Sequence, residues 1–229
     1  MLTLVRARLA EFCRDHSGIA ATEMAFIAPI MILLALMGVD VTRYALATEQ
    51  IEQVANTIGQ MIVTTGPTTP GGSSATVSDT DLQFYHDSAM VIFPDVLSDA
   101  ANQGVPWSND IAISMAFIQF TQVAPSCTVA GPACYHAAPI WTAGNKWRSC
   151  NTKPIGALPS DASVPSPTAL PPDVYGPGSL IAVDVQYTYH PWFGSYFGMA
   201  LPIARSMYIA PRYVQTLTYQ GSGIIAQTC

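Results

Sequence analysis

Glu23 is the one charged residue within the 21 residues from 19 to 39, a run that is otherwise almost wholly apolar. A helix of that length, at about 1.5 Å per residue, covers roughly 30 Å, which is the thickness of a bilayer's hydrocarbon core. A carboxylate inside lipid is costly unless it is paired. Glu23 is therefore a candidate for pairing with a positive charge in the membrane. The alternative is an interfacial acid that stabilises the positive end of the helix dipole.

Gly18 directly precedes this run and closes a leader that contains Arg6, Arg8 and Arg14. An ordinary secretory signal has an apolar region of about 7 to 15 residues followed by a small-residue cleavage site and a polar mature start. Here the apolar run is longer, and the small residue stands before it. Cleavage after Gly18 would leave the apolar segment on the mature protein, with Ile19 as the new N-terminus.

The charges of the chain are divided unequally between the leader and the rest. Beyond residue 18 the sequence has 6 basic and 13 acidic residues. Because basic flanks stay in the cytoplasm, we expect a cytoplasmic N-terminus and a C-terminal region on the outer side of the membrane. An acidic body without a Lys/Arg cluster argues against nucleic-acid binding.

The cysteines follow the same division. Cys13 lies in the leader, and the other four lie beyond the apolar run, at Cys127, Cys134, Cys150 and Cys229. Four cysteines in an exported region are typical of two disulfides, for which three pairings exist. We favour Cys127 with Cys134 and Cys150 with Cys229. The alternative is a set of unpaired buried thiols.

Motifs of enzymatic chemistry are absent from the sequence. It has no G-x-x-x-x-G-K-[ST] phosphate loop and no G-x-S-x-G nucleophile elbow. Its four histidines form no H-x-x-x-H pair. Cys134 and His136, with Cys127 and Cys150, can be drawn as a zinc site, but their spacing fits no common zinc pattern. We predict a protein that is not an enzyme and has no metal or cofactor.

The elements that would position these residues begin with a long helix. Pro29 lies inside the apolar run and is expected to kink the helix. Asp40 and Arg43 mark its exit from lipid. Beyond them apolar residues recur at spacings of three and four up to residue 61, which predicts one helix of about 45 residues ending at Val63. We expect its narrow apolar stripe to pack on the chain's own head, the alternative being the helices of partner subunits.

The remainder of the sequence indicates an α+β head with a small antiparallel sheet. A breaker-rich linker is followed by a helical pattern over residues 79–101, with Asp79 or Thr80 as N-cap and Pro94 as a breaker within it. Alternating strands are expected over residues 111–117 and 180–189, with a third within 204–219 that Pro211 interrupts. The 60 or so residues between the first two strands show no sustained period and offer a surface for partners.

The N-terminal residues also resemble a known family. Gly18, the apolar run and Glu23 at the fifth mature position resemble the class III signal of type IV pilin-like proteins, although the usual Phe after the Glu is Met24 here. The longer stretch from Arg14 to Phe26, followed by Pro29, resembles TadE/TadG-like proteins, the minor pseudopilins of the tight adherence (Flp) pilus. An alternating strand over residues 179–191, followed by a second strand that contains a proline-arginine, is similar to how such chains close.

This resemblance implies a function and a division of the chain. A prepilin peptidase would cut between Gly18 and Ile19, and Glu23 would meet the new amino group of Ile19 on its own chain or on a neighbour's during assembly, with Met24 beside it. The partners would be other pilin-like subunits and the pilus assembly platform. The implied division is a leader over 1–18, a bacterial inner-membrane helix over 19–63, a linker over 64–80 and a periplasmic head over 81–229.

Two other readings of the sequence lead to different functions. One is an uncleaved single-pass envelope protein whose head is a periplasmic binding or scaffold module. The other is a secreted hydrolase with a long signal, whose mature chain would begin near or after Val39. The mature N-terminus distinguishes all three.

Overall fold

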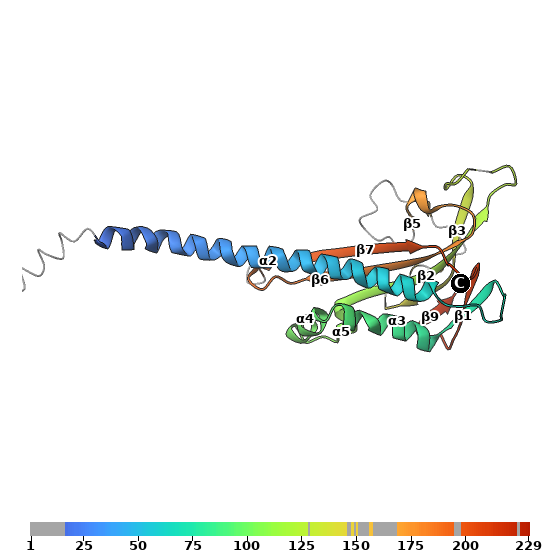
Figure 1. Cartoon of the computed structure of the whole chain (residues 1–229), viewed down its shortest axis with the longest axis horizontal. Coiled ribbons are helices and arrows are strands. Elements are labelled where there is room, and N and C mark those ends of the chain that lie inside the picture. The colour runs from blue at the N-terminus through green and yellow to red at the C-terminus, as the bar shows by residue number, and fades with distance from the viewer. Residues whose placement is uncertain are drawn as a thin grey trace, which may run out of the picture.

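A single helix, α2 (Ser17–Val63), runs from the N-terminal side of the chain into the head and sets the shape of the molecule (Figure 1). The computed structural model describes residues 17–127, 129–145, 148, 150, 156–157, 169–194, 198–223 and 225–229. Its 47-residue helix confirms the predicted continuous helix, including the predicted end at Val63. The first half of α2 projects from the head, whereas the second half lies on it.

An antiparallel sheet forms the centre of the head. Among the described residues, five strands follow the order β7-β6-β2-β3-β9. Their bounds are β2 (Ile111–Gln122), β3 (Tyr135–Gly144), β6 (Ser179–Tyr189), β7 (Leu201–Ile209) and β9 (Ala226–Thr228). The long helix with this sheet confirms the predicted α+β fold.

The smaller elements surround this sheet. Strand β1 (Ser74–Ser78) pairs in parallel with β8 (Thr216–Gln220), and β4 (Gly156–Ala157) pairs with β5 (Ala169–Leu170). The helices of the head are α3 (Asp79–Ile92), α4 (Asp95–Gln103) and α5 (Trp107–Asp110), with a short 3-10 helix at Pro172–Val174.

Side chains of the central strands alternate between two cores, as the period of two requires. On β2, Ile113 and Met115 belong to the larger core, whereas Ala116 and Ile118 belong to the smaller one on the opposite face. The larger core is closed by α2 and α3, and the smaller one by the segment around Tyr175. The alternation predicted for residues 111–117 and 180–189 is therefore confirmed.

The second half of α2 packs on β6, β7 and α3. Ile51, Val54 and Ile58 are fully buried there, which confirms that the apolar stripe packs on the chain's own head. Gly59 permits the close approach, because a Cβ at this position would lie 2.8 Å from Cδ1 of Ile209 on β7.

A buried ion pair lies on the opposite face of the sheet. Nε of Arg148 lies 2.6 Å from one carboxylate oxygen of Asp184, and its Nη2 lies 2.9 Å from the other. Ser206 donates a further hydrogen bond to Asp184. Burial opposes the charge of Arg148, but the Asp184 carboxylate outweighs it and holds the arginine's pKa above its usual value. Arg148 lies in a stretch of the chain that shows no period in the sequence. The ion pair with Asp184 holds it against β6, an inner strand of the sheet.

The first helix of the head begins at a capping box. Ser78 accepts a hydrogen bond from the backbone N–H of Asp81, and the Asp81 carboxylate accepts one from the N–H of Ser78. The N-cap is therefore Ser78, and the predicted Asp79 or Thr80 was wrong by one or two residues. Pro94 does divide the predicted helical segment, because α3 ends at Ile92 and α4 begins at Asp95.

Three other expectations need correction. The predicted linker over 64–80 includes strand β1 and the first residues of α3, because residues 74–78 pair with β8. The predicted third strand is two strands, β7 and β8, which belong to different sheets on either side of Pro211. The segment without a period contains β3, where Pro139 and a bulge opposite Phe117 and Ile118 break the alternation.

Candidate functional site: the exposed half of the long helix and its junction with the head

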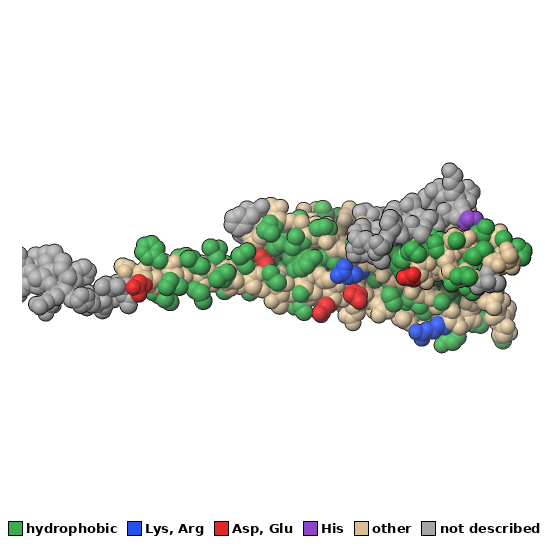
Figure 2. Space-filling view, turned by 90° about the horizontal axis from the view of Figure 1, so that it is seen from above, with side chains coloured by type: hydrophobic (Ala, Val, Ile, Leu, Met, Phe, Trp, Pro, Cys, Tyr) green, Lys and Arg blue, Asp and Glu red, His purple; other side chains and the backbone are tan. Residues whose placement is uncertain are grey.

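The first half of α2 exposes apolar side chains at consecutive positions and so on all sides, and Figure 2 shows those on the face in view. The large exposed ones are Met24, Phe26, Ile27, Ile30, Met31, Ile32, Leu33, Leu34, Met37, Val39, Val41 and Leu46. By length and composition, α2 is the one helix of the described chain that could cross a membrane, and its most apolar window has no buried residue. The core helix of a soluble protein would bury such a surface. An uninterrupted apolar surface of this kind indicates a lipid or partner-helix environment.

The predicted processing and assembly residues lie in the first turns of α2. Gly18 and Ile19 follow the helix start at Ser17, and Glu23 and Met24 lie about one turn further on, both exposed. Positions 19 and 23 are four residues apart and therefore lie on one face of the helix. No cation lies within ion-pair distance of Glu23 among the residues that the structure describes. The leader up to residue 16, which includes Cys13, lies outside the described residues.

Pro29 lies inside α2, and the helix continues on both sides of it. A proline within a membrane helix is tolerated where nearby groups satisfy the freed carbonyl. The kink expected at Pro29 stays a prediction.

The helix is joined to the head through Asp40, the first charged residue after the apolar run. Its carboxylate accepts three backbone hydrogen bonds from the β6–β7 loop, a name that we use for residues 190–194 and 198–200. The donors are the N–H groups of Trp192 at 3.0 Å, Phe193 at 3.1 Å and Gly194 at 3.1 Å. In Figure 1 this loop lies beside α2 at the end of the head from which the bare helix projects.

Aromatic contacts reinforce the same junction. The guanidinium carbon of Arg43 lies 3.3 Å from the centre of the Trp192 ring. One residue further along α2, the ring of Tyr44 meets Tyr189 edge to face at 5.7 Å. Asp40, Arg43 and Tyr44 therefore all contact the end of β6 or its loop. The sequence marked Asp40 and Arg43 as the exit from lipid but gave no sign of these partners, which lie about 150 residues away.

A polar cluster supports the base of this loop. Nδ1 of His190 lies 3.0 Å from a carboxylate oxygen of Asp99 on α4, which also accepts a hydrogen bond from Tyr187 at 2.5 Å. Burial, with the hydrogen bond to Asp99, raises the pKa of Tyr187 well above its usual value. The tyrosine therefore stays a neutral donor. Gln103 links His190 to Asp110 through its amide nitrogen.

The same cluster provides the one group of potential metal ligands found among the described residues. One ligand atom from each of Asp99, Asp110 and His190 lies within 4.8 Å of the others. Burial raises the pKa of Asp110; Gln103 opposes this shift and the charge of Asp99 adds to it. Because Tyr187 and Gln103 already donate to these groups, the arrangement is explained as a hydrogen-bonded support for the loop. A hollow of about 540 Å³ opens beside it, between α2, α4 and the end of β6.

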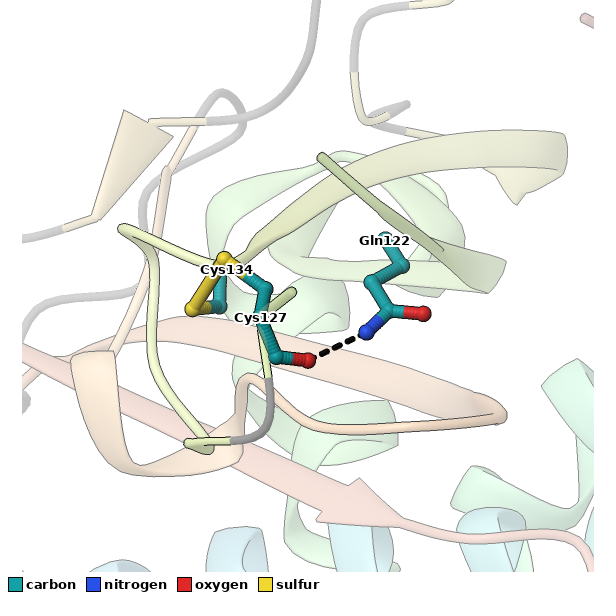
Figure 3. The surroundings of a disulfide bond; sticks show 3 residues. All are labelled: Gln122, Cys127 and Cys134. Carbon is teal, nitrogen blue, oxygen red and sulfur yellow. Dashed lines mark hydrogen bonds between the residues drawn. A yellow bond between two sulfur atoms is a disulfide. The ribbon is translucent and has the colours of Figure 1, made fainter. Parts of the chain in front are cut away.

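The four cysteines beyond the helix lie in two pairs. Cys127 bonds to Cys134 with a Cα–Cα distance of 5.2 Å, and Cys150 bonds to Cys229 with a Cα–Cα distance of 5.0 Å. This is the favoured pairing of the three that the sequence allows. Figure 3 shows the first bond, where the Gln122 side chain donates to the Cys127 carbonyl at the end of β2. Both bonds stabilise parts of the head with little regular structure, and they remove the thiolates that a zinc site at Cys127, Cys134 and Cys150 would need.

Comparison with known proteins gives one match. Residues 18–59 match the model of a family described as TadE-like protein. No curated protein and no solved structure matches the chain. The matched segment begins at Gly18, includes Glu23, Pro29 and Asp40, and ends within the packed half of α2. The resemblance seen in the N-terminal residues is thereby confirmed over this segment, in which the long helix is similar to that of TadE-like proteins.

Proposed function

We propose that this protein is a membrane-anchored, pilin-like assembly component, a minor pseudopilin of the tight adherence (Flp) pilus, and that it acts without enzymatic chemistry. The first half of α2 anchors it in the bacterial inner membrane as a single span. The head stands on the periplasmic side. Its partners are a prepilin peptidase, other pilin-like subunits and the pilus assembly platform.

One observation carries this proposal. The segment that matches the TadE-like family is a single helix whose first half exposes apolar side chains on every side and whose second half is part of the head's core. Pilin-like assembly requires such a helix, because subunits associate through their membrane segments while the head remains folded outside. Gly18 and Glu23 stand at the start of this segment.

The chemistry of assembly would be carried by Glu23. Cleavage after Gly18 creates a positively charged amino group on Ile19, and the backbone of Ile19 lies one helical turn before Glu23. Pairing this amino group with the carboxylate, within one chain or between neighbours, would neutralise two charges that are costly in lipid. Glu23 would thus favour insertion of a processed subunit beside another.

The orientation follows from the leader. Arg6, Arg8 and Arg14 favour a cytoplasmic N-terminus, so the head would cross to the periplasm. The cysteine bonds of the head agree with that side, where disulfides persist.

Processing is tested by mass spectrometry of the intact protein, purified from membranes of a cell that carries the pilus system. We expect a mature chain that begins at Ile19 in the wild type and an unprocessed chain for Gly18→Leu. A mature chain that begins at Met1 would refute processing, though not anchoring. One that begins near or after Val39 would refute the anchor and favour a secreted protein.

The role of Glu23 is tested by co-purification with the other pilin-like subunits after mild crosslinking. Glu23→Gln removes the charge at nearly constant size, and Glu49→Gln, on the exposed surface of the same helix, is the matched control. We expect the first variant to lose crosslinks to partner subunits while it remains in the membrane, and the control to keep them. Equal crosslinking of the two variants would leave Glu23 as an interfacial helix-stabilising acid.

The alternative function is an uncleaved single-pass envelope protein with a binding or scaffold module. The hollow beside Asp99 and His190 is the observation that favours it, because it could receive a small ligand or a peptide. Retention of the leader together with full activity of the pilus in a deletion strain would favour this alternative.

A further inference from the structure

The β6–β7 loop presents apolar side chains to solvent at the end of the head from which the bare helix projects. Trp192 is 57% exposed and Met199 is 50% exposed. The N–H of Met199 donates to the carbonyl of Gly194 at 3.2 Å, so these two residues are held together.

Asp40 determines where this loop stands along the helix. The three N–H groups of residues 192–194 all donate to its carboxylate. The apolar run ends at Val39, one residue before Asp40. Arg43, stacked on the Trp192 ring, lies three residues further, or about 4.5 Å along the axis. Trp192 is therefore held within about one helical turn of the point where the apolar run ends.

The loop also explains how Asp40 can stand so close to lipid. An ionised carboxylate near hydrocarbon is costly unless its oxygens are satisfied. The three backbone N–H groups of residues 192–194 satisfy the carboxylate oxygens of Asp40 without adding a positive charge. The guanidinium of Arg43 lies beyond Asp40, on the outer side of the apolar run, and covers the Trp192 ring. Tryptophan rings concentrate at the membrane interface, where one end of the ring is apolar and the other is hydrated.

We propose that the β6–β7 loop is a second membrane contact, in which Trp192 and Met199 enter the headgroup region of the outer leaflet beside the helix. This inference rests on the proposed anchoring function, because it requires α2 to cross the bilayer. The occupant of the surface is lipid, because Asp40 and Arg43 hold Trp192 within about one helical turn of the end of the apolar run. Two contacts fix the orientation of the head relative to the membrane plane, which one helix alone would not do.

Depth-dependent fluorescence quenching tests the contact. The full chain is reconstituted into vesicles of phosphatidylethanolamine and phosphatidylglycerol that contain lipids brominated either near the headgroup or near the end of the acyl chain. We expect quenching by the shallow bromines, most of which is lost in Trp192→Phe. The matched control is Trp107→Phe, a half-buried ring that packs against His86 within the head and should leave the quenching unchanged.

A second pair of variants tests the positioning role of Asp40. Asp40→Ala removes the acceptor of the three loop N–H groups and should reduce the shallow quenching, whereas Glu49→Ala, about two and a half turns further along the same helix, should not. Flotation of the vesicles is measured in parallel. Both Asp40→Ala and Glu49→Ala should float with the lipid, because the apolar run is unchanged.

The outcomes separate the two proposals. Vesicles that float with the protein, but whose shallow quenching is the same in wild type and Trp192→Phe, would overturn the second contact and leave the anchor intact. Protection of Trp192 that appears only after another pilin-like subunit is added would overturn it in favour of a protein partner. Protein that does not float would overturn the anchor, and the loop contact with it.

Discussion

The two halves of α2 use apolar residues in opposite ways. Residues 22–46 carry large apolar side chains on all sides, nearly all exposed, whereas residues 47–63 carry theirs in a stripe that is buried against β6, β7 and α3. The helix is nevertheless continuous across the boundary. An apolar surface without a stripe is built for surroundings that are apolar on every side, and a stripe is built for one packed face. The head first touches the helix at Asp40, about two turns before this boundary.

The largest expected effect comes from truncating one isoleucine in each half. Ile58 is fully buried, and Ile58→Ala should lower the free energy of unfolding of the head by about 2–5 kcal/mol, through lost transfer energy and the cavity that remains. Ile30 is 60% exposed, and Ile30→Ala should leave the head's stability unchanged. Denaturant unfolding of the full chain in detergent, followed by near-ultraviolet circular dichroism, measures both. Equal losses would mean that the two halves are not different environments.

The same comparison can be made by adding volume at a glycine in each half of α2, instead of removing it. A Cβ at Gly59 would lie 2.8 Å from Cδ1 of Ile209, whereas a Cβ at Gly38 would have no neighbour within 4 Å. Gly59→Val should therefore force the Ile209 and Met207 side chains to repack and destabilise the head by about 1–3 kcal/mol. Gly38→Val should not change the head's melting temperature. A destabilisation by Gly38→Val as large as that of Gly59→Val would show that propensity, rather than packing, controls the effect.

The division of α2 could be predicted from the sequence because both of its signals are local. The unbroken apolar run and the later spacing of three and four are read within one stretch of chain, and so are the alternating strands β2 and β6. The processing residues Gly18 and Glu23 are likewise defined by their distance from one another. For Glu23 the structure adds only that its side chain is exposed.

What could not be predicted depends on residues far apart in the chain or on short pairings. Nothing near Asp40 shows that its carboxylate receives N–H groups from residues 192–194. Nothing near Asp184, within the predicted strand over residues 180–189, shows that its carboxylate is buried against Arg148. Strand β3 is hidden by Pro139 and its bulge, and β9 has three residues, too few for a pattern.

The junction at which the head first touches the helix is tested by Asp40→Ala. Loss of the carboxylate leaves three loop N–H groups without their acceptor, and because they can turn to water the head should lose only about 1 kcal/mol. The larger change should be local. Hydrogen exchange, measured by mass spectrometry of peptides that cover residues 190–194, should become faster, while exchange in β2 stays the same. Unchanged exchange in the loop would mean that Asp40 does not hold it to the helix.

The smallest expected effect concerns a charged residue beside the buried stripe. Glu52 follows the fully buried Ile51, and its carboxylate lies 3.9 Å from Nε of Arg205 on β7, with 72% of its side chain exposed. Exposed ion pairs of this kind contribute about 0–1 kcal/mol, because solvent screens them and ordering two long side chains costs entropy. Glu52→Gln should therefore change the free energy of unfolding by less than about 0.5 kcal/mol, in the same assay in which Ile51→Ala loses several times more. If Glu52→Gln matched Ile51→Ala, charge rather than apolar burial would attach the second half of α2 to the head, and the contrast between the two halves would have to be explained by where their charges lie.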